Sequence, residues 1–320
     1  MKPTIRRICF AVFSLYLCAV TVFAKDLIPV GKVIGLELSA GTVTVAAFED
    51  SLTAGRSSGL QVGDTIVSID DTAIRCAEDV RQALRTSDGS VNLTILREGE
   101  KKILNIQPQI TTDGPKLGVY LKQGITGIGT VTFYDPETGL FGALGHGVSD
   151  NRGALLPFSR GNAYPASIVS IQKGKSGAPG QLKGALKSNH LLGTLQSNTT
   201  RGIFGTTSSG WKGATIPIAT AEEVRPGDAI IRSTIRDGEP KDYSVKILKI
   251  YPKTRPDGRN LLIEITDRAL LDTTGGIIQG MSGSPIIQDG KLVGAVTHVL
   301  VNNPTRGYGI LIENMLDAAE

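Results

Sequence analysis

Short runs of β-branched and aliphatic residues recur along most of this chain, and many of them are followed within a few residues by a glycine or an Asp-Gly pair. The chain has 39 glycines in 320 residues, and aromatic residues make up only 5%. Glycine adopts the backbone angles that tight turns require, whereas β-branched residues favour strands. The pattern predicts a mainly β protein that is long enough for two domains with separate cores.

A segment at residues 107–116 divides the chain into two regions. It contains two prolines and an Asp-Gly pair, which interrupt regular structure. We therefore expect a linker there, between a first domain at residues 27–108 and a second domain at residues 117–320.

The first region predicts a small β-rich domain with one or two helices. Residues 65–69 form an apolar run after a turn, and residues 91–95 alternate as in a half-buried strand. Residues 77–85 predict a helix, because Val80 and Leu84 fall on one helical face.

The second region predicts many short strands and few helices. Asp257-Gly258 and Asp289-Gly290 are typical hairpin turns. Regular strand spacing with glycine-rich turns favours an all-β barrel or sandwich. The strands expected include residues 129–133, 166–172, 229–234, 244–250, 261–266 and 291–298, with a short helix at 313–319.

The first 24 residues have the pattern of a targeting segment. Lys2, Arg6 and Arg7 precede an uncharged, mostly apolar run that ends in Val22-Phe23-Ala24. This run is at the short limit for a membrane span. We expect a cleaved signal peptide at residues 1–24, with a retained N-terminal membrane anchor as the alternative. Either one predicts export across the cytoplasmic membrane.

Composition and motifs argue against several other classes of site. Cys9 and Cys18 fall inside the targeting segment, so Cys76 would be the one cysteine of the mature chain, without a disulfide partner or a zinc cluster. The net charge of +4 is not gathered in a basic block, so we expect no nucleic-acid partner. The Gly-Lys-Ser sequence at 174–176 lacks the earlier glycine of a phosphate loop, since Val169 stands there. We predict no cofactor and no metal.

The sharpest chemical signal is Gly280-Met281-Ser282-Gly283-Ser284-Pro285. A serine between glycines can occupy a tight turn with its hydroxyl exposed. The backbone N–H groups of Gly280 and Ser282 could then point at one substrate oxygen, as acyl transfer requires. Ser282 is therefore the candidate nucleophile, with an ordinary Gly/Ser turn as the alternative.

A serine nucleophile needs a base, and outside the targeting segment the candidates are His146, His190 and His298. His146 is favoured because it stands between two glycines, which leave room for a substrate beside the imidazole. His298 follows a predicted strand among valines, which favours a packed position, and His190 has no supporting context.

A carboxylate is expected to orient the base and to stabilise its protonated form. Asp267 follows the apolar strand at 261–266, beside the nucleophile turn, and is the first candidate. Asp228, Asp272 and Asp150 remain as alternatives, with Asp228 the main one.

The first region resembles the PDZ domains attached to exported bacterial proteases. The resemblance rests on Gly59-Leu60-Gln61-Val62-Gly63-Asp64-Thr65-Ile66, followed by Ile69-Asp70. It implies that Ile34-Gly35-Leu36 forms the loop whose N–H groups receive a peptide carboxylate or chain terminus. Val80 and Leu84 would then line the side-chain pockets of a groove in which the peptide adds as a strand.

Beyond that domain, the chain resembles the stage IV sporulation protein B peptidase family. The matching motifs are Gly-Ala-Leu-Gly-His146-Gly, Thr266-Asp267, Gly-Met-Ser282-Gly-Ser-Pro, Gly294-Ala-Val-Thr-His298-Val and Gly307-Tyr308-Gly309. The resemblance implies a chymotrypsin-like serine peptidase barrel with His146 as base, Asp267 as orienting residue and Ser282 as nucleophile. The short spacing between Asp267 and Ser282 departs from chymotrypsin-like enzymes.

The function implied by this resemblance is limited proteolysis during endospore formation, in the space between the forespore and mother-cell membranes. The expected protein substrate is a membrane-associated regulator of an intramembrane protease, whose release leads to sigma-factor activation. Self-cleavage is also implied. The alternatives are a general envelope quality-control protease and a PDZ scaffold with an inactive peptidase site.

Overall fold

The computed structural model describes residues 25–149, 153–156, 160–187, 190–236 and 238–320. The predicted signal peptide or anchor at residues 1–24 lies outside the described residues. Among the residues that are described, no helix is long and apolar enough to cross a membrane. Strands account for most of the regular structure, which confirms the mainly β prediction. The short helices are α2 (Ala54–Ser57), α3 (Ala77–Arg85), α4 (Arg268–Thr274) and α5 (Ile312–Leu316).

The C-terminal part forms a closed six-stranded antiparallel barrel, as predicted for the peptidase domain. Alternate residues of its strands point inward: Leu261, Ile263 and Ile265 are all buried, and the residues between them are half-buried. In barrel order the strands are β16 (Gly227–Ser233), β17 (Lys241–Ile250), β18 (Leu261–Ile265), β21 (Asn303–Leu311), β20 (Lys291–Leu300) and β19 (Pro285–Gln288).

A second ring of strands lies against this barrel. Pairing runs from β9 through β10, β14, β13, β11 and β2, and returns to β9 because β2 pairs with both β11 and β9. The strands are β2 (Val33–Phe48), β9 (Val119–Tyr134), β10 (Leu140–Ala143), β11 (Arg160–Gln172), β13 (Gly193–Thr199) and β14 (Gly202–Thr206). Short strands at its margins are β1 (Asp26–Pro29), β12 (Gln181–Leu186) and β15 (Ile216–Pro217).

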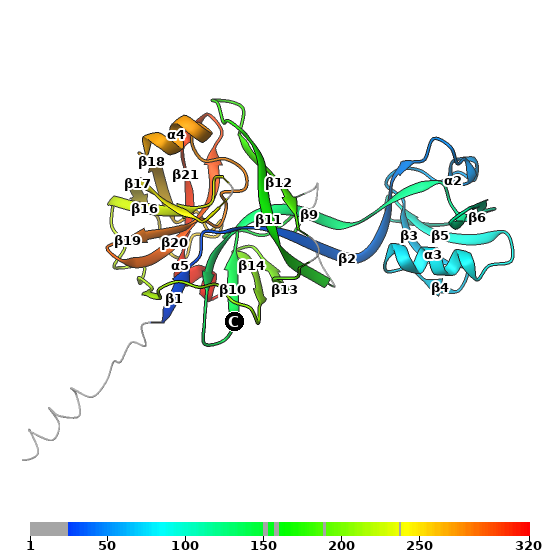
Figure 1. Ribbon diagram of the computed structural model, residues 1–320, viewed down its shortest axis with the longest axis horizontal. Coiled ribbons are helices and arrows are strands. Elements are labelled where there is room, and N and C mark those ends of the chain that lie inside the picture. The colour runs from blue at the N-terminus through cyan, green and yellow to red at the C-terminus, as the bar shows by residue number, and fades with distance from the viewer. Residues whose placement is uncertain (1–24, 150–152, 157–159, 188–189, 237) are drawn as a thin grey trace, which may run out of the picture.

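The domain predicted to be a PDZ domain is inserted into this second ring, between β2 and β9. Both strands leave the ring and run side by side into a separate body (Figure 1), where Val43–Phe48 pairs with Val119–Gln123. There they join β3 (Thr65–Ile69), β4 (Thr72–Ala73), β5 (Val91–Arg97) and β6 (Glu100–Ile106). This body has its own buried core, to which Val80 and Leu84 of α3 contribute. The helix predicted at 77–85 and the strand predicted at 65–69 are both present.

Two expectations about the first region are wrong. Residues 107–116 are not a linker: β7 (Gln109–Thr111) and β8 (Gly114–Lys116) pair as a hairpin. The segment from residue 26 to residue 38 pairs with β9, β11 and β15 of the peptidase part, so it does not belong with the PDZ body as the boundary at residue 27 supposed. Pairing between strands so distant in sequence leaves no local signal in the sequence.

The proposed carboxylate loop Ile34-Gly35-Leu36 is likewise not a loop. These residues lie near the start of β2, paired with β9 on one side and β11 on the other, so their backbone groups belong to the sheet. Ile34 and Leu36 are buried. A Cβ at Gly35 would stand 2.3 Å from the Leu186 side chain, so the glycine serves strand packing rather than ligand access.

The departure of β9 from the ring depends on Gly124. We therefore predict that replacing Gly124 by alanine lowers the stability far more than replacing Gly127 of the same strand. Gly124 has a φ of +61°, and a Cβ there would lie 1.7 Å from the Leu38 carbonyl oxygen. Gly124→Ala should therefore lower the free energy of unfolding by about 2 kcal/mol or more. Gly127→Ala is the matched control, because nothing lies within 4 Å of its added Cβ. Urea denaturation of both variants tests this, and equal losses would contradict it.

Candidate active site

Ser282 lies in a tight turn directly before β19. The glycines on either side have φ values of +97° at Gly280 and +96° at Gly283, which other residues rarely adopt. A Cβ at Gly283 would also lie 1.9 Å from the Thr130 carbonyl oxygen. Glycine at position 283 therefore lets the turn approach β9 closely.

Strand β9 holds this turn in place through hydrogen bonds that sequence reasoning missed. The Thr130 hydroxyl donates to the Gly280 carbonyl and the Thr132 hydroxyl to the Gly283 carbonyl, each at 2.8 Å. The Thr130 N–H donates to the Ser282 carbonyl at 3.0 Å. The alternation of Thr130 and Thr132 on one face of a predicted strand was the only available signal.

The backbone N–H groups of the turn divide into two sets. Those of Met281, Gly283 and Ser284 donate to the carbonyls of Ile278, Val296 and Met281. In the part of the chain that the structure describes, the N–H groups of Gly280 and Ser282 have no such acceptor. They are the pair that was predicted to bind a substrate oxyanion, and this arrangement leaves them available to donate.

His146 follows β10, on a loop whose course requires two positive φ angles, at Leu144 and Gly145. Its Nδ1 lies 2.9 Å from the Gly147 carbonyl oxygen. Since a carbonyl can only accept, Nδ1 carries the proton, and Nε2 of the neutral ring is the free acceptor. Burial lowers the pKa of His146, and the bond to Gly147 offsets this only in part. The ring is therefore set up as a neutral base.

Asn198 fixes the segment that follows His146, and it too was missed. Its Oδ1 accepts from the Val148 N–H at 2.9 Å. Its Nδ2 donates to the carbonyls of Val148 at 2.8 Å and of Leu156 at 2.9 Å. These three bonds fix the backbone two residues after the base. One asparagine in a polar hairpin sequence gave no signal of this role.

Ser282, His146 and His298 line one pocket of about 490 Å³. The Ser282 hydroxyl donates to the Thr297 carbonyl at 2.8 Å, so in this conformation it does not donate to His146. Rotation about the serine side chain is needed to bring the two together, and catalytic hydrogen bonds commonly tighten only when substrate binds.

His298 faces His146 across 5.1 Å between ring centroids. Burial, together with the nearby His146, lowers the pKa of His298 to about 4. Its Nδ1 is buried without a hydrogen-bond partner among the described residues. His190, the third candidate base, is exposed and does not line this pocket.

The structure does not place Asp267 beside His146. Asp267 is the N-cap of α4, where its carboxylate accepts from the Leu270 N–H at 2.9 Å. It does not line the pocket, and its charge acts on Tyr243, whose pKa it raises together with burial. A helix N-cap and a catalytic carboxylate both favour an Asp after a strand, so the sequence pattern does not distinguish the two roles.

The alternatives Asp228 and Asp272 do not line the pocket of His146 either. The Asp228 side chain is 95% exposed, and its nearest cation is Lys246 at 3.9 Å. Asp272 is exposed on α4. Asp150 lies outside the described residues. The Gly147 carbonyl is therefore the group that holds Nδ1 of His146 in this structure.

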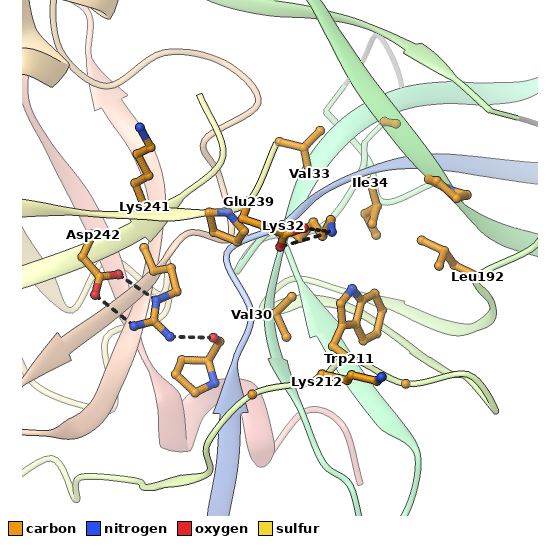
Figure 2. Close-up of a pocket in the computed structure, with 17 residues that line it drawn as sticks. Val30, Lys32, Val33, Ile34, Leu192, Trp211, Lys212, Glu239, Lys241 and Asp242 are labelled. Atoms are coloured by element: carbon orange, nitrogen blue, oxygen red, sulfur yellow. Dashed lines mark hydrogen bonds and ion pairs between the residues drawn. The ribbon is translucent and has the colours of Figure 1, made fainter. Parts of the chain in front are cut away.

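The larger cavity of the molecule, about 790 Å³, is lined by residues of both barrels and contains none of the candidate catalytic residues. Its lining includes the ion pair between Lys32 and Glu239, whose charged atoms lie 3.1 Å apart. The side chains of Trp211 and Leu192 also line this cavity (Figure 2). Arg232 pairs with Asp242 at 2.7 Å and donates to the Pro29 carbonyl at 3.4 Å. The Lys32–Glu239 and Arg232–Pro29 contacts join the two barrels.

Val80 and Leu84 do line a groove of the PDZ body, as predicted, but with different partners. The opposite wall is the segment from Pro115 to Leu121, and the volume is about 250 Å³. Gly118 has a φ of +72° at the turn into β9. This segment takes the position that was assigned to Ile34-Gly35-Leu36.

Comparison with known proteins identifies the family of the chain and its second domain. Residues 113–316, more than half of the chain, match the SpoIVB peptidase S55 family. The chain belongs to the SpoIVB peptidase S55 family. Residues 53–97 match a PDZ domain. The chain is therefore a serine peptidase with a PDZ domain, as predicted.

The remaining comparisons are weaker. Among solved structures, the chain is similar to the Rv3671c protease in its inactive form, with 14% identity, 60% of this chain and 82% of that chain covered, and a TM-score of 0.34. A search of curated proteins found no match.

The site geometry predicts which substitutions abolish turnover. Ser282→Ala and His146→Ala should each lower kcat by about 10⁴-fold or more, because nucleophile and base act as a unit. Asp267→Ala should keep most of its kcat/KM and lose about 1 kcal/mol of stability, because it removes an N-cap. Peptide hydrolysis and thermal unfolding of the three variants check this. A folded but inactive Asp267→Ala protein would show that this carboxylate reaches His146 during turnover.

Burial of His146 predicts the direction of the pH dependence. The base acts when neutral, and its pKa lies below the ordinary 6.5. The rate should therefore persist as the pH falls through 6.5 and decline only when His146 becomes protonated at lower pH. The measurement is kcat/KM against pH, repeated in His298→Gln to remove the second imidazole. An acidic midpoint at or above 6.5 in both proteins would contradict the neutral, buried base.

Proposed function

We propose that this serine peptidase carries out limited, signalling-type cleavage of a membrane-associated regulatory protein during endospore formation, and that it also cleaves itself. The regulator would control an intramembrane protease, and its cleavage would lead to sigma-factor activation. The observation that carries the proposal is the sharing of β2 and β9 between a peptide-binding body and the wall of the catalytic pocket. Such an arrangement suits a chosen substrate better than general degradation.

The chemistry would follow the acyl-enzyme route. Ser282 Oγ attacks the scissile carbonyl carbon and passes its proton to Nε2 of His146. The N–H groups of Gly280 and Ser282 donate to the oxyanion that forms. His146 then gives the proton to the leaving amine, and water releases the acyl group by the same steps with His146 again as base.

The proposed location is the exported side of the cytoplasmic membrane, in the space between the forespore and mother-cell membranes. The support is the targeting pattern of residues 1–24 in the sequence together with the family.

The decisive experiment combines the purified protein with membranes from sporulating cells that lack it. Newly formed protein N-termini are mapped by mass spectrometry, with Ser282→Ala as the control. We expect one or a few membrane-associated proteins to be cut at single sites. Degradation of unfolded proteins into many fragments would instead indicate a quality-control protease. A wild-type protein that forms no adduct with a serine-directed probe would indicate an inactive scaffold.

The PDZ groove is proposed to bind an extended segment or chain terminus of the substrate. On one side β9 pairs with β2, and among the described residues no strand pairs with its other edge at 119–123. A peptide could add there as a strand, next to α3. Two cations, Arg81 and Lys116, and one carboxylate, Glu49, line the groove, and the net positive charge would favour a carboxylate.

Charge reversal in the groove tests this role. Arg81→Glu should lower cleavage of the natural protein substrate by about 5-fold and leave hydrolysis of a short peptide unchanged. Arg85→Glu is the matched control, because Arg85 is exposed on the same helix but does not line the groove. Both rates are measured on all three proteins. Equal loss of both rates, or equal loss in the control, would contradict a targeting role.

A further inference from the structure

The pocket around Ser282 has mostly apolar walls. Its lining includes the segment from Ile277 to Gly280, which leads directly into the nucleophile turn, and residues of β2 and β9. The apolar side chains most relevant to a bound substrate are Leu36, Ile125, Ile128, Ile278, Val299 and Val301. Of these, Val301 is 46% exposed, so it is an apolar surface that a substrate can still cover.

No Asp, Glu, Lys or Arg is found among the described residues that line this pocket. A charged substrate side chain entering it would lose water without gaining an ion partner, which costs several kcal/mol. The two imidazoles do not supply a charge either, because burial lowers the pKa of both. An aliphatic side chain, by contrast, gains about 0.8 kcal/mol for each buried CH₂ group.

The position of these walls identifies which substrate residue they contact. In the acyl-enzyme the residue on the N-terminal side of the cut is bonded to Ser282 Oγ. Its side chain is therefore the substrate side chain closest to the pocket that Ser282 lines, whose lining includes Ile277 to Gly280.

We infer that the peptidase selects a large aliphatic residue, such as Leu, Ile or Met, immediately before the scissile bond. The inference rests on the proposed peptidase activity of this site and adds its substrate class. Leu should be preferred over Ala by about 50-fold in kcat/KM, since it buries three more carbon atoms. Lys and Glu should be cleaved more slowly than Ala.

The first experiment uses the full chain and a mixture of synthetic peptides with varied sequences. Cut sites are mapped by mass spectrometry, and a matched set with Leu, Ala, Lys or Glu before the preferred bond is then compared in kcat/KM. Enrichment of aliphatic residues before the cut is expected. Cleavage after Lys or Glu at rates comparable to Leu would overturn the inference.

A substitution in the pocket provides an independent test. Val301→Glu adds a carboxylate to the wall and should lower the preference for Leu over Lys by about tenfold or more. Val169→Glu is the matched control, because Val169 is 71% exposed on β11 and does not line the pocket. The control should keep the wild-type preference. An unchanged preference in folded Val301→Glu would count against this pocket as the source of selectivity.

Reaction with a serine-directed fluorophosphonate distinguishes a failure of the aliphatic selectivity from a failure of the peptidase chemistry. If Ser282 is labelled but the cuts follow charged residues, only the aliphatic selectivity fails. If Ser282 is not labelled and no peptide is cut, the proposed peptidase chemistry fails, and the selectivity fails with it.

Discussion

The hydrogen bonds between β9 and the nucleophile turn are the contacts on which the site depends. Ser282 belongs to the C-terminal barrel and His146 to the ring of strands before it, so neither barrel contains a complete site. Thr130 and Thr132 of β9 bind the carbonyls at Gly280, Ser282 and Gly283. A carbonyl buried in a turn must find a donor, and here the donors come from the other barrel. The nucleophile turn therefore takes its shape only when the two barrels are packed together.

The same strand explains why the PDZ body is not a separate module on a flexible tether. β9 runs from Val119 at the peptide groove, past Ile125 and Ile128 in the catalytic pocket, to Thr130 at the nucleophile turn. Its partner β2 accompanies it over most of this length. Two paired strands are stiffer than a linker, because each residue is held by the hydrogen-bond ladder. The groove and the catalytic pocket thus share one element.

Sequence reasoning succeeded where the signal is local and failed where it depends on distant pairing. The helix at 77–85 and the turn around Ser282 follow from spacing and from glycine chemistry within a few residues. The Ile34-Gly35-Leu36 error is instructive, because an apolar-Gly-apolar triplet suits both a loop that receives a carboxylate and a central strand. Only Leu186, some 150 residues later, decides between them, by occupying the space that a side chain at Gly35 would need. Asp267 is ambiguous in the same way, because an Asp after a strand also caps a helix.

The environment of His146 limits the turnover rate that this peptidase can reach. Its Nδ1 is held by the Gly147 carbonyl, which fixes the tautomer as a triad carboxylate would. A carbonyl carries a dipole rather than a full charge, so it stabilises the imidazolium formed during acyl transfer less than a carboxylate does. Burial and the apolar pocket also disfavour the imidazolium form of His146. Such a base costs turnover rate but keeps its neutral form over a wide pH range. That balance fits an enzyme that makes a few chosen cuts better than one that degrades proteins in bulk.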